Sequence, residues 1–357
     1  MFSIPDARAV LEVLQPVQDP ELRQSLVELN MIRNVKVVAG KVSFTLVLTT
    51  PACPLREFIV EDCEKAVKTL SGVETVDIEV TAETPQQKSL PNRQGIVGVK
   101  NILAVSSGKG GVGKSTVAVN VAVALAQVGA KVGLLDADIY GPNAPTMLGL
   151  ADANVIAQEG TQGQVLDPAF NYGVKLVSMG FLIDPDQPVM WRGPMLNGII
   201  RQFLYQVQWG ELDYLIVDMP PGTGDAQLTL IQAVPMAGAV IVTTPQTVSL
   251  IDARRGLKMF QQLQTPVLGI VENMSYFIPP DLPDRQYDIF GSDGGKRASQ
   301  ELDVPLLGCV PLEPSLRQGG DRGLPIVAAD PASASAQALT AIAQQIAARV
   351  SVAALAS

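Results

Sequence analysis

The pattern of apolar and polar residues begins with a short region of mixed helix and strand signals. Residues 5–14 have helical spacing, and residues 32–38 and 42–48 form two strands around an Ala-Gly turn. Apolar residues alternate along 42–48, which predicts a strand with one buried face. A helix over 54–70 and a strand over 73–80 follow. These elements predict a small α+β domain.

Two polar segments interrupt this pattern. Asp19-Pro20-Glu21 has the form of an N-cap, a first-position proline and an acidic first turn, and it predicts a further helix. Residues 83–97 are mostly polar and contain two prolines, which is typical of a linker. The predicted domains are therefore 1–82 and 98–357, joined by this linker.

From residue 98 onward, short apolar strands alternate with helical segments. The strands are predicted at residues 102–105, 132–135, 215–217, 239–242, 267–271 and 306–310. Such alternation favours a mostly parallel sheet covered by helices on both faces. The predicted fold class is α/β for this domain, with the small α+β domain before it.

Composition narrows the function classes. Hydrophobic residues make up 47% of the chain and charged residues only 17%, which indicates buried cores. The net charge of −9 argues against general affinity for nucleic acid or an anionic membrane. The sequence contains no histidine, which excludes Ser-His-Asp and Cys-His catalysis and imidazole metal ligands.

The sequence also predicts the compartment. The first residues lack a basic region followed by an apolar run, and no stretch approaches about 18 uninterrupted apolar residues. Three cysteines, an odd number, argue against a disulfide framework and favour a reducing environment. We therefore expect a cytoplasmic protein that binds neither membrane nor nucleic acid.

The segment after the strand at 102–105 carries the clearest chemistry. It matches the phosphate-loop pattern G-x-x-x-x-G-K-[ST] between a predicted strand and a predicted helix. Loop amides and a helix N-terminus converge there on one anion. Lys114 is expected to reach the β and γ phosphates, and the Ser115 hydroxyl to bind Mg²⁺. The predicted nucleotide-binding residues here are Gly108, Lys109, Gly110, Gly111, Val112, Gly113, Lys114, Ser115 and Thr116.

Carboxylates follow two other predicted strands. Asp136 and Asp138 come directly after the strand at 132–135, and Asp218 ends the apolar run Leu215-Ile216-Val217. Carboxyl ends of parallel strands meet at one edge of the sheet, where ligands bind. We assign Asp138 to orienting or activating the attacking water. Asp136 and Asp218 are expected to hold magnesium, directly or through water. The predicted reaction is phosphoryl transfer to water by positioning and charge stabilisation, without a covalent intermediate.

Lys109 adds a second lysine directly after the first loop glycine. The pattern K-G-G-x-G-K-[ST] resembles the deviant Walker A motif of the MinD, ParA and nitrogenase iron protein group of ATPases. In that group the first lysine reaches across a dimer to the partner's nucleotide. The resemblance implies a homodimer across ATP, with Lys109 as a catalytic residue beside Lys114 and Asp138.

Further segments resemble one branch of this group. Glu272-Asn273-Met274 resembles the adenine-contacting segment, which implies that Asn273 reads the base edge and that ATP is the nucleotide. Several segments resemble the Mrp/ApbC branch of iron–sulfur cluster carriers, namely Val242 to Gln246, Asp252 to Gly256, Glu272 to Phe277, Asp19 to Glu21 and Thr49 to Leu55. The resemblance implies iron–sulfur apoproteins and assembly proteins as partners, and a [4Fe–4S] cluster as cargo.

The sequence departs from this branch at the cluster site. A Cys-x-x-Cys pair usually follows Ser-Tyr-Phe in the branch, whereas Pro279 and Leu282 occupy the corresponding positions here. Cys53 is the candidate thiol, because the predicted helix at 54–70 places it near a helix N-terminus, which favours a thiolate. Cys63 and Cys309 are expected to be packing residues. Cys53 itself is either reactive or a packing residue.

Three functions remain open from the sequence. The first is an ATP-hydrolysing carrier that transfers iron–sulfur clusters to apoproteins. The second is a positioning ATPase of the MinD or ParA kind, although the C-terminal segment lacks a basic amphipathic face. The third is a nucleotide-gated scaffold without turnover.

Overall fold

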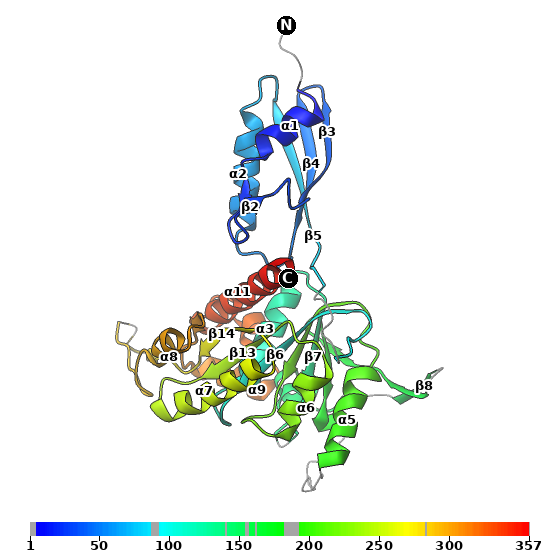
Figure 1. Ribbon diagram of the computed structural model, residues 1–357. Helices are drawn as coiled ribbons and strands as arrows, with labels where there is room; N and C mark the ends of the chain where they lie inside the picture. The colour runs from blue at the N-terminus through cyan, green and yellow to red at the C-terminus, as the bar shows by residue number, and fades with distance from the viewer. Residues whose placement is uncertain are drawn as a thin grey trace. The chain divides into compact units, whose positions relative to one another are not determined.

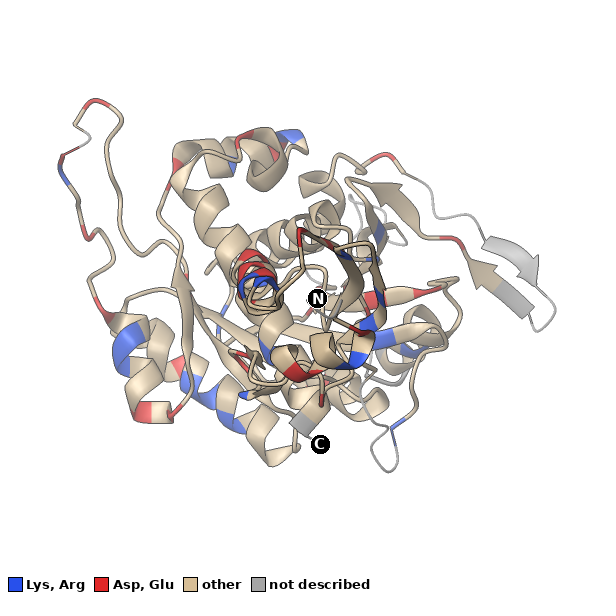
Figure 2. Cartoon of the chain, turned by 90° about the horizontal axis from the view of Figure 1, so that it is seen from above, with Lys and Arg blue, Asp and Glu red and all other residues tan. Residues whose placement is uncertain are grey.

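The computed structural model describes residues 5–86, 93–139, 141–153, 157–160, 163–181, 193–282 and 284–356. The chain forms two compact units. The small unit comprises Met1–Pro85 and Ala347–Ser357, and the large unit comprises Gln86–Ile346. Most of the chain is tan in Figure 2, in keeping with the low share of charged residues.

The small unit is a three-stranded sheet with two helices. Its elements are α1 (Ala7–Leu14), β1 (Gln18–Asp19), β2 (Gln24–Ser25), β3 (Ile32–Val38), β4 (Lys41–Leu48), α2 (Arg56–Lys68) and β5 (Thr75–Ala82). The sheet order is β3-β4-β5, with an antiparallel hairpin β3–β4 and a parallel pair β4–β5 joined through α2 (Figure 1). Val42, Phe44 and Leu46 of the central strand are buried with Ile59 and Cys63 of α2. The predicted hairpin and α2 are confirmed.

The predicted helix at Asp19-Pro20-Glu21 is wrong. Asp19 does cap a turn, since its carboxylate accepts hydrogen bonds from the backbone N–H groups of Glu21 and Leu22, both at 2.9 Å. The turn ends at Arg23, whose φ of 54° is left-handed. β1 and β2 then pair with each other in place of a second helical turn.

The large unit is built on an eight-stranded sheet in the order β10-β11-β7-β12-β6-β13-β14-β15. Its strands are β6 (Val99–Ser107), β7 (Val132–Asp136), β10 (Ala169–Asn171), β11 (Val174–Ser178), β12 (Leu212–Asp218), β13 (Gly238–Thr243), β14 (Val267–Glu272) and β15 (Leu306–Cys309), and β8 (Ala157–Gly160) and β9 (Gly163–Leu166) form a separate hairpin. All pairs in the large sheet are parallel except β10–β11. The six predicted strands are present, and the sheet contains two further strands, β10 and β11, that were not predicted.

Helices cover both faces of this sheet. They are α3 (Lys114–Gln127), α4 (Ala144–Met147), α5 (Gly193–Tyr205), α6 (Asp225–Ala233), α7 (Thr247–Gln262), α8 (Gly294–Leu302), α9 (Pro314–Arg322), α10 (Ile326–Ala329) and α11 (Ala334–Ala356), with a short 3₁₀ helix at Met179–Phe181. Leu215 and Val217 of β12 join a core with residues of α5, α6, α7 and α8. α3 connects strands in the opposite direction along the sheet, so it lies on the other face, against β6, β7 and β12 (Figure 1).

The last helix is long and apolar. Within the described residues, Ala334–Leu355 is the one helical segment long and apolar enough to cross a membrane by length and composition. Leu339, Ile342 and Ile346 of this helix are buried. Ile342 packs against Gly308 of β15, where an added Cβ would lie 2.8 Å from it. This part of α11 is therefore a core element of the large unit.

Candidate functional site

The glycine-rich loop connects β6 to α3 at the centre of the sheet. Gly111 and Gly113 have left-handed φ values of 78° and 85°, which glycine adopts without strain. A Cβ on Gly108 would lie 2.1 Å from the backbone of Asp252 in α7, so the loop is packed closely on that side. Gly110 and Gly111 have nothing within 4 Å of an added Cβ. One side of the loop is thus held by α7, and the other is open.

Lys114 begins α3 and lies among carboxylates. Its Nζ is 2.6 Å from Oδ1 of Asp218 and 3.4 Å from Oδ2 of Asp138, and its side chain is 6% exposed. Burial by itself lowers the pKa of Lys114, but Asp218 and Asp138 raise it above its ordinary value. Lys114 is therefore a fully charged cation at neutral pH.

Asp136 lies beneath this ion pair. It ends β7 directly opposite Asp218 at the end of β12, and both side chains are fully buried. Its Oδ2 accepts hydrogen bonds from Ser178 Oγ at 3.0 Å and from the Ala144 N–H at 3.1 Å. Burial and the negative charge of Asp218 raise the pKa of Asp136 to about 7. The site therefore concentrates negative charge that a cation would neutralise.

These side chains fit magnesium. Oδ2 of Asp218 is buried and has no hydrogen-bond partner among the described residues, and Ser115 beside it is 8% exposed. Mg²⁺ prefers oxygen ligands and takes few of them from protein, with phosphate and water completing the shell. Ser115, Asp218 and, through water, Asp136 supply such oxygens. A magnesium ion bound there would neutralise the phosphate charge.

Lys109 differs from Lys114 in having no such neighbours. Its side chain is half-buried, and within the part of the chain that the structure describes it forms no ion pair. Its backbone carbonyl accepts a hydrogen bond from Ser107 Oγ at 2.9 Å, which holds the start of the loop. The ammonium group therefore remains available to a negative charge outside these residues.

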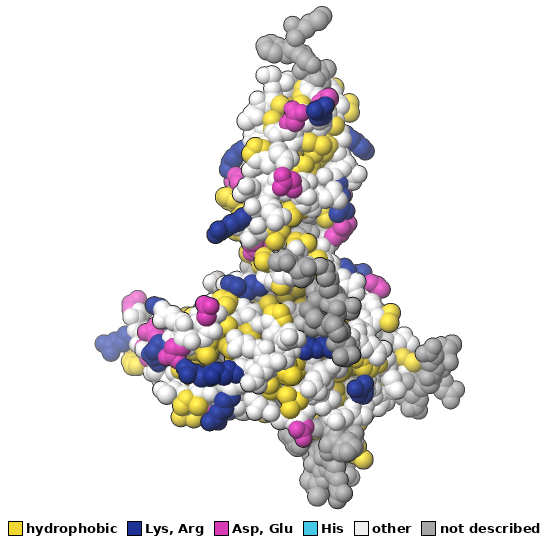
Figure 3. All heavy atoms as spheres, in the orientation of Figure 1, with side chains coloured by type: hydrophobic (Ala, Val, Ile, Leu, Met, Phe, Trp, Pro, Cys, Tyr) yellow, Lys and Arg dark blue, Asp and Glu magenta, His cyan; other side chains and the backbone are white. Residues whose placement is uncertain are grey.

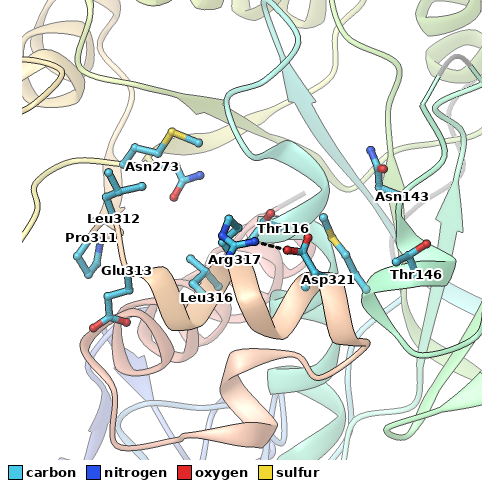
Figure 4. Close-up of a pocket in the computed structure, with 13 residues that line it drawn as sticks. Thr116, Asn143, Thr146, Asn273, Pro311, Leu312, Glu313, Leu316, Arg317 and Asp321 are labelled. Carbon is cyan, nitrogen blue, oxygen red and sulfur yellow. Dashed lines mark hydrogen bonds and ion pairs between the residues drawn. The ribbon is translucent and has the colours of Figure 1, made fainter.

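A cavity of about 330 Å³ opens beside the first turn of α3 (Figure 4). It is lined by Thr116, Asn143, Thr146, Met147, Asn273, Met274, Pro311, Leu312, Glu313, Leu316, Arg317, Gly320 and Asp321. Asn273 is 3% exposed, and its amide nitrogen donates to the Val112 carbonyl of the phosphate loop at 2.9 Å. The carboxamide oxygen is the remaining polar atom of this side chain.

Most of this lining was not predicted from sequence. The segment from Pro311 to Asp321 follows β15, which is the strand next to β14 in the sheet. Leu312 and Leu316 line the same cavity as Asn273 because β14 and β15 are neighbours in the sheet. The order of strands in a sheet cannot be read from one sequence. Glu313 accepts a hydrogen bond from the Ser335 N–H at 3.1 Å, which fixes this wall of the cavity.

Cys53 and Cys63 belong to the small unit. Cys63 is fully buried in the small unit, and burial raises its pKa to about 12. Burial also raises the pKa of Cys53, a backbone hydrogen bond from Leu55 opposes the shift, and the charges of Glu21 and Asp19 add to it, so these surroundings do not favour the thiolate. α2 begins at Arg56, three residues after Cys53.

Cys309 and the segment in place of the missing cysteine pair belong to the large unit. Cys309 is half-buried and donates to Oε1 of Glu272 at 3.8 Å. Phe277 and Tyr287 pair through two backbone hydrogen bonds and bracket Pro279 and Leu282. Among the described residues, no group of three or more Cys, Asp or Glu side chains is placed to hold a metal ion. The described side chains therefore do not form a complete cluster site within one chain.

Comparison with known proteins agrees with this site. Residues 98–347 match the model of the NUBPL iron-transfer P-loop NTPases, and residues 7–80 match that of an iron–sulfur cluster assembly protein. The chain is 80% identical over 347 residues to an iron–sulfur cluster carrier protein of Synechocystis, covering 97% of this chain and 98% of the relative. It is 49% identical over 346 residues to one of Deinococcus radiodurans, covering 96% and 95%.

A solved structure supports the fold. An ADP-bound nucleotide-binding protein from Archaeoglobus fulgidus has a TM-score of 0.56 and 39% identity, covering 64% of this chain and 88% of that one. The predicted P-loop NTPase fold and the resemblance to the Mrp/ApbC branch are both confirmed. This protein belongs to the iron–sulfur cluster carrier family of P-loop NTPases.

Proposed function

We propose that this protein binds and hydrolyses ATP and uses the cycle to transfer iron–sulfur clusters to apoproteins. The observation that supports this most strongly is Lys114 at the N-terminus of α3, between Asp218 and Asp138 and beside the cavity that Asn273 lines. A phosphate-binding loop, buried carboxylates and a base-sized cavity are thus contiguous in one unit. The assignment of an iron–sulfur cluster as the cargo rests on the names of the similar proteins.

We assign the phosphates to the loop from Gly108 to Thr116. The loop amides and the N-terminus of α3 would bind the phosphate oxygens, because both present unpaired N–H groups and partial positive charge. The ion pair of Lys114 with Asp218 gives way to pairing with the β and γ phosphates. Asp218 and Ser115 are then free to face magnesium, with Asp136 behind them.

Adenine is the base that fits the cavity. The oxygen of the Asn273 carboxamide accepts hydrogen bonds, since its nitrogen already donates to the loop. Adenine presents an amino donor where guanine presents a carbonyl acceptor. Asn273 would thereby favour ATP over GTP.

Hydrolysis requires an oriented water. Asp138 is 8% exposed, and its Oδ2 lies 3.4 Å from Nζ of Lys114. Because Lys114 would pair with the β and γ phosphates, Asp138 would lie close to the γ phosphate. We assign it to orienting that water. Lys109 would reach the nucleotide of a second protomer, which makes the active form a homodimer across ATP.

The small domain over 1–82 and the linker over 83–97 would serve contact with assembly proteins or apoproteins. All three cysteines are free thiols, which suits the reducing cytoplasm. Each protomer of a homodimer would supply one Cys53 thiol, and a recipient's thiols would complete the ligands of a [4Fe–4S] cluster in transfer. This protein would then share a cluster with its recipient during delivery.

An ATPase assay with and without magnesium tests the first half of the proposal. Lys114→Ala and Asp138→Ala should each lower kcat by about a hundredfold or more, because each removes a charge aimed at the transition state. Equal rates of ATP hydrolysis in the wild type and both variants would show that this site does not catalyse the reaction.

Anaerobic reconstitution with iron and sulfide tests the second half. The wild type should gain visible absorption and iron, and an apoprotein acceptor should then become active. Cys53→Ser should lose most of the bound iron, whereas Cys63→Ser should keep it. A colourless, iron-free wild type would contradict the proposed cluster transfer but not the proposed ATP hydrolysis.

A further inference from the structure

A second cavity, away from the phosphate site, forms a groove between α7 and α8. Its volume is about 320 Å³, and it is lined by Thr247, Leu250, Ile251, Arg254, Arg297, Ala298, Glu301 and Leu302. The two helices lie side by side at the lower left of Figure 1. We call this surface the α7–α8 groove.

The groove lies between two helices that are basic in an acidic protein. α7 and α8 carry five lysine and arginine residues and two acidic ones, whereas the whole chain has a net charge of −9. Both acidic residues are already paired with arginines, Asp252 with Arg255 at 3.2 Å and Glu301 with Arg254. Dark blue side chains lie over these helices at the lower left of Figure 3, with yellow and magenta ones among them.

Arg297 of the lining and Lys258, which lies one turn after Arg254 on the same side of α7, have no carboxylate partner among the described residues. Arg297 donates only to a backbone carbonyl, that of Ser292, at 3.0 Å. Asp293 and Asp303 flank the two ends of α8 and do not line the groove. The surplus positive charge therefore faces outward, where a carboxylate could pair with it.

Apolar side chains lie between these charges. Leu250 and Leu302 form part of the lining, and Ile251 of α7 is 50% exposed. Val248, one turn earlier on α7, is 66% exposed. Exposed aliphatic residues next to unpaired cations suit a segment that offers apolar and acidic side chains together.

Both helices that form the groove contact residues at or next to the proposed nucleotide site. α7 touches the phosphate loop at Gly108, beside Lys109. The first turn of α8 is held by the buried carboxylate of Glu272, which accepts from the Gly295 N–H at 2.5 Å. Glu272 directly precedes Asn273. A segment in the groove would thus contact one helix that packs on the phosphate loop and one that is bonded to the residue before Asn273.

We propose that the α7–α8 groove docks an acidic, amphipathic segment of a partner protein. Carboxylates of the segment pair with Arg297 and Lys258, and its apolar face covers Ile251 and Leu302. The complementarity of charge selects this occupant over a basic or neutral segment. The proposal concerns the surface alone and holds whatever cargo the protein carries.

Panning a random dodecapeptide display library against the full chain tests the proposal. Enriched peptides should combine Asp or Glu with Leu, Ile or Phe. Synthetic copies should bind the variant Ile251→Asp with Arg297→Glu about tenfold or more weakly. A matched control, Val97→Asp with Lys131→Glu, makes the same charge change at exposed residues outside the groove and should bind like the wild type.

Three outcomes would overturn the proposal. The first is that no acidic peptide is enriched, or that enriched peptides bind the groove variant and the wild type equally. The second is that the groove variant changes the sedimentation coefficient, which would make the groove an interface between two copies of this chain. The third is that the wild type, and not the groove variant, binds phosphatidylglycerol vesicles, which would make it a membrane surface.

Discussion

Replacing Asp136 by Asn should stabilise the nucleotide-free protein. Asp136 is fully buried opposite Asp218 on the neighbouring strand, so two carboxylates share a site away from water. Lys114 forms its ion pairs with Asp218 and Asp138. Asn has nearly the same size as Asp but carries no charge. The substitution therefore removes a buried charge without leaving a cavity.

The magnitude follows from the pKa and the hydrogen bonds of Asp136. Its pKa of about 7, against an ordinary 3.8, corresponds to about 4 kcal/mol of unfavourable free energy for the ionised form in the fold. Asn keeps one oxygen for Ser178 and Ala144, but its amide nitrogen cannot accept from the Asp138 N–H. That loss costs about 1–2 kcal/mol. The net gain at pH 8 is about 2 kcal/mol.

The pH dependence has a definite sign. Between the ordinary and the folded pKa of Asp136, the folded protein binds a proton that the unfolded chain has released. The free energy of unfolding of the wild type should therefore fall as pH rises from about 4 to about 7 and then level off. The Asn variant lacks this component, so its stability should vary less over that range.

Urea unfolding of the nucleotide-free protein measures both effects. Tryptophan fluorescence follows the large unit through the buried Trp209. Ser178→Ala is the matched control, because it removes a hydrogen bond but keeps the carboxylate and hence the pH dependence. The reasoning fails if the Asn variant is less stable than the wild type at pH 8, or if its stability falls equally steeply with pH.

Three further predictions concern the loop, the base cavity and the thiols. Gly108→Ala should lower the free energy of unfolding by about 2 kcal/mol or more, because its Cβ would lie 2.1 Å from the backbone of α7. Gly110→Ala, whose Cβ meets nothing within 4 Å, should stay within about 0.5 kcal/mol in urea unfolding without nucleotide, and equal losses would contradict the packing argument. Asn273→Ala should raise the Kd for ATP about tenfold in calorimetry, and an unchanged Kd would place the base elsewhere. Iodoacetamide should alkylate Cys53 in the native protein long before Cys63, which is 0% exposed, and mass spectrometry showing similar rates would contradict this burial.

The phosphate loop and the strands around it were predictable because their signals are local. The pattern from Gly108 to Ser115 sets the loop length, and the apolar runs on either side set the strand and the helix. Asp136 and Asp218 were predicted to lie near the loop because both end parallel strands. The structure places them opposite each other on the paired strands β7 and β12, and β12 lies next to β6 in the sheet.

Predictions that depended on the tertiary surroundings of a single residue agreed with the structure less often than those for the phosphate loop. Asp19-Pro20-Glu21 has a helix-start signal, but pairing of β1 with β2 overrides it after one turn. The helix dipole argument for Cys53 assumed that α2 begins beside it. Burial near Glu21 and Asp19 instead raises its pKa.

The sequence by itself determined the fold class, the phosphate loop and the family, because each depends on residues adjacent in the chain or on overall pattern. The tertiary structure alone decided the lining of the base cavity, the pKa of Asp136 and the groove between the basic helices α7 and α8. Each of these requires side chains from separate segments to lie within a few ångströms of one another. The order of strands in the sheet sets those distances, and the order along the chain does not state it.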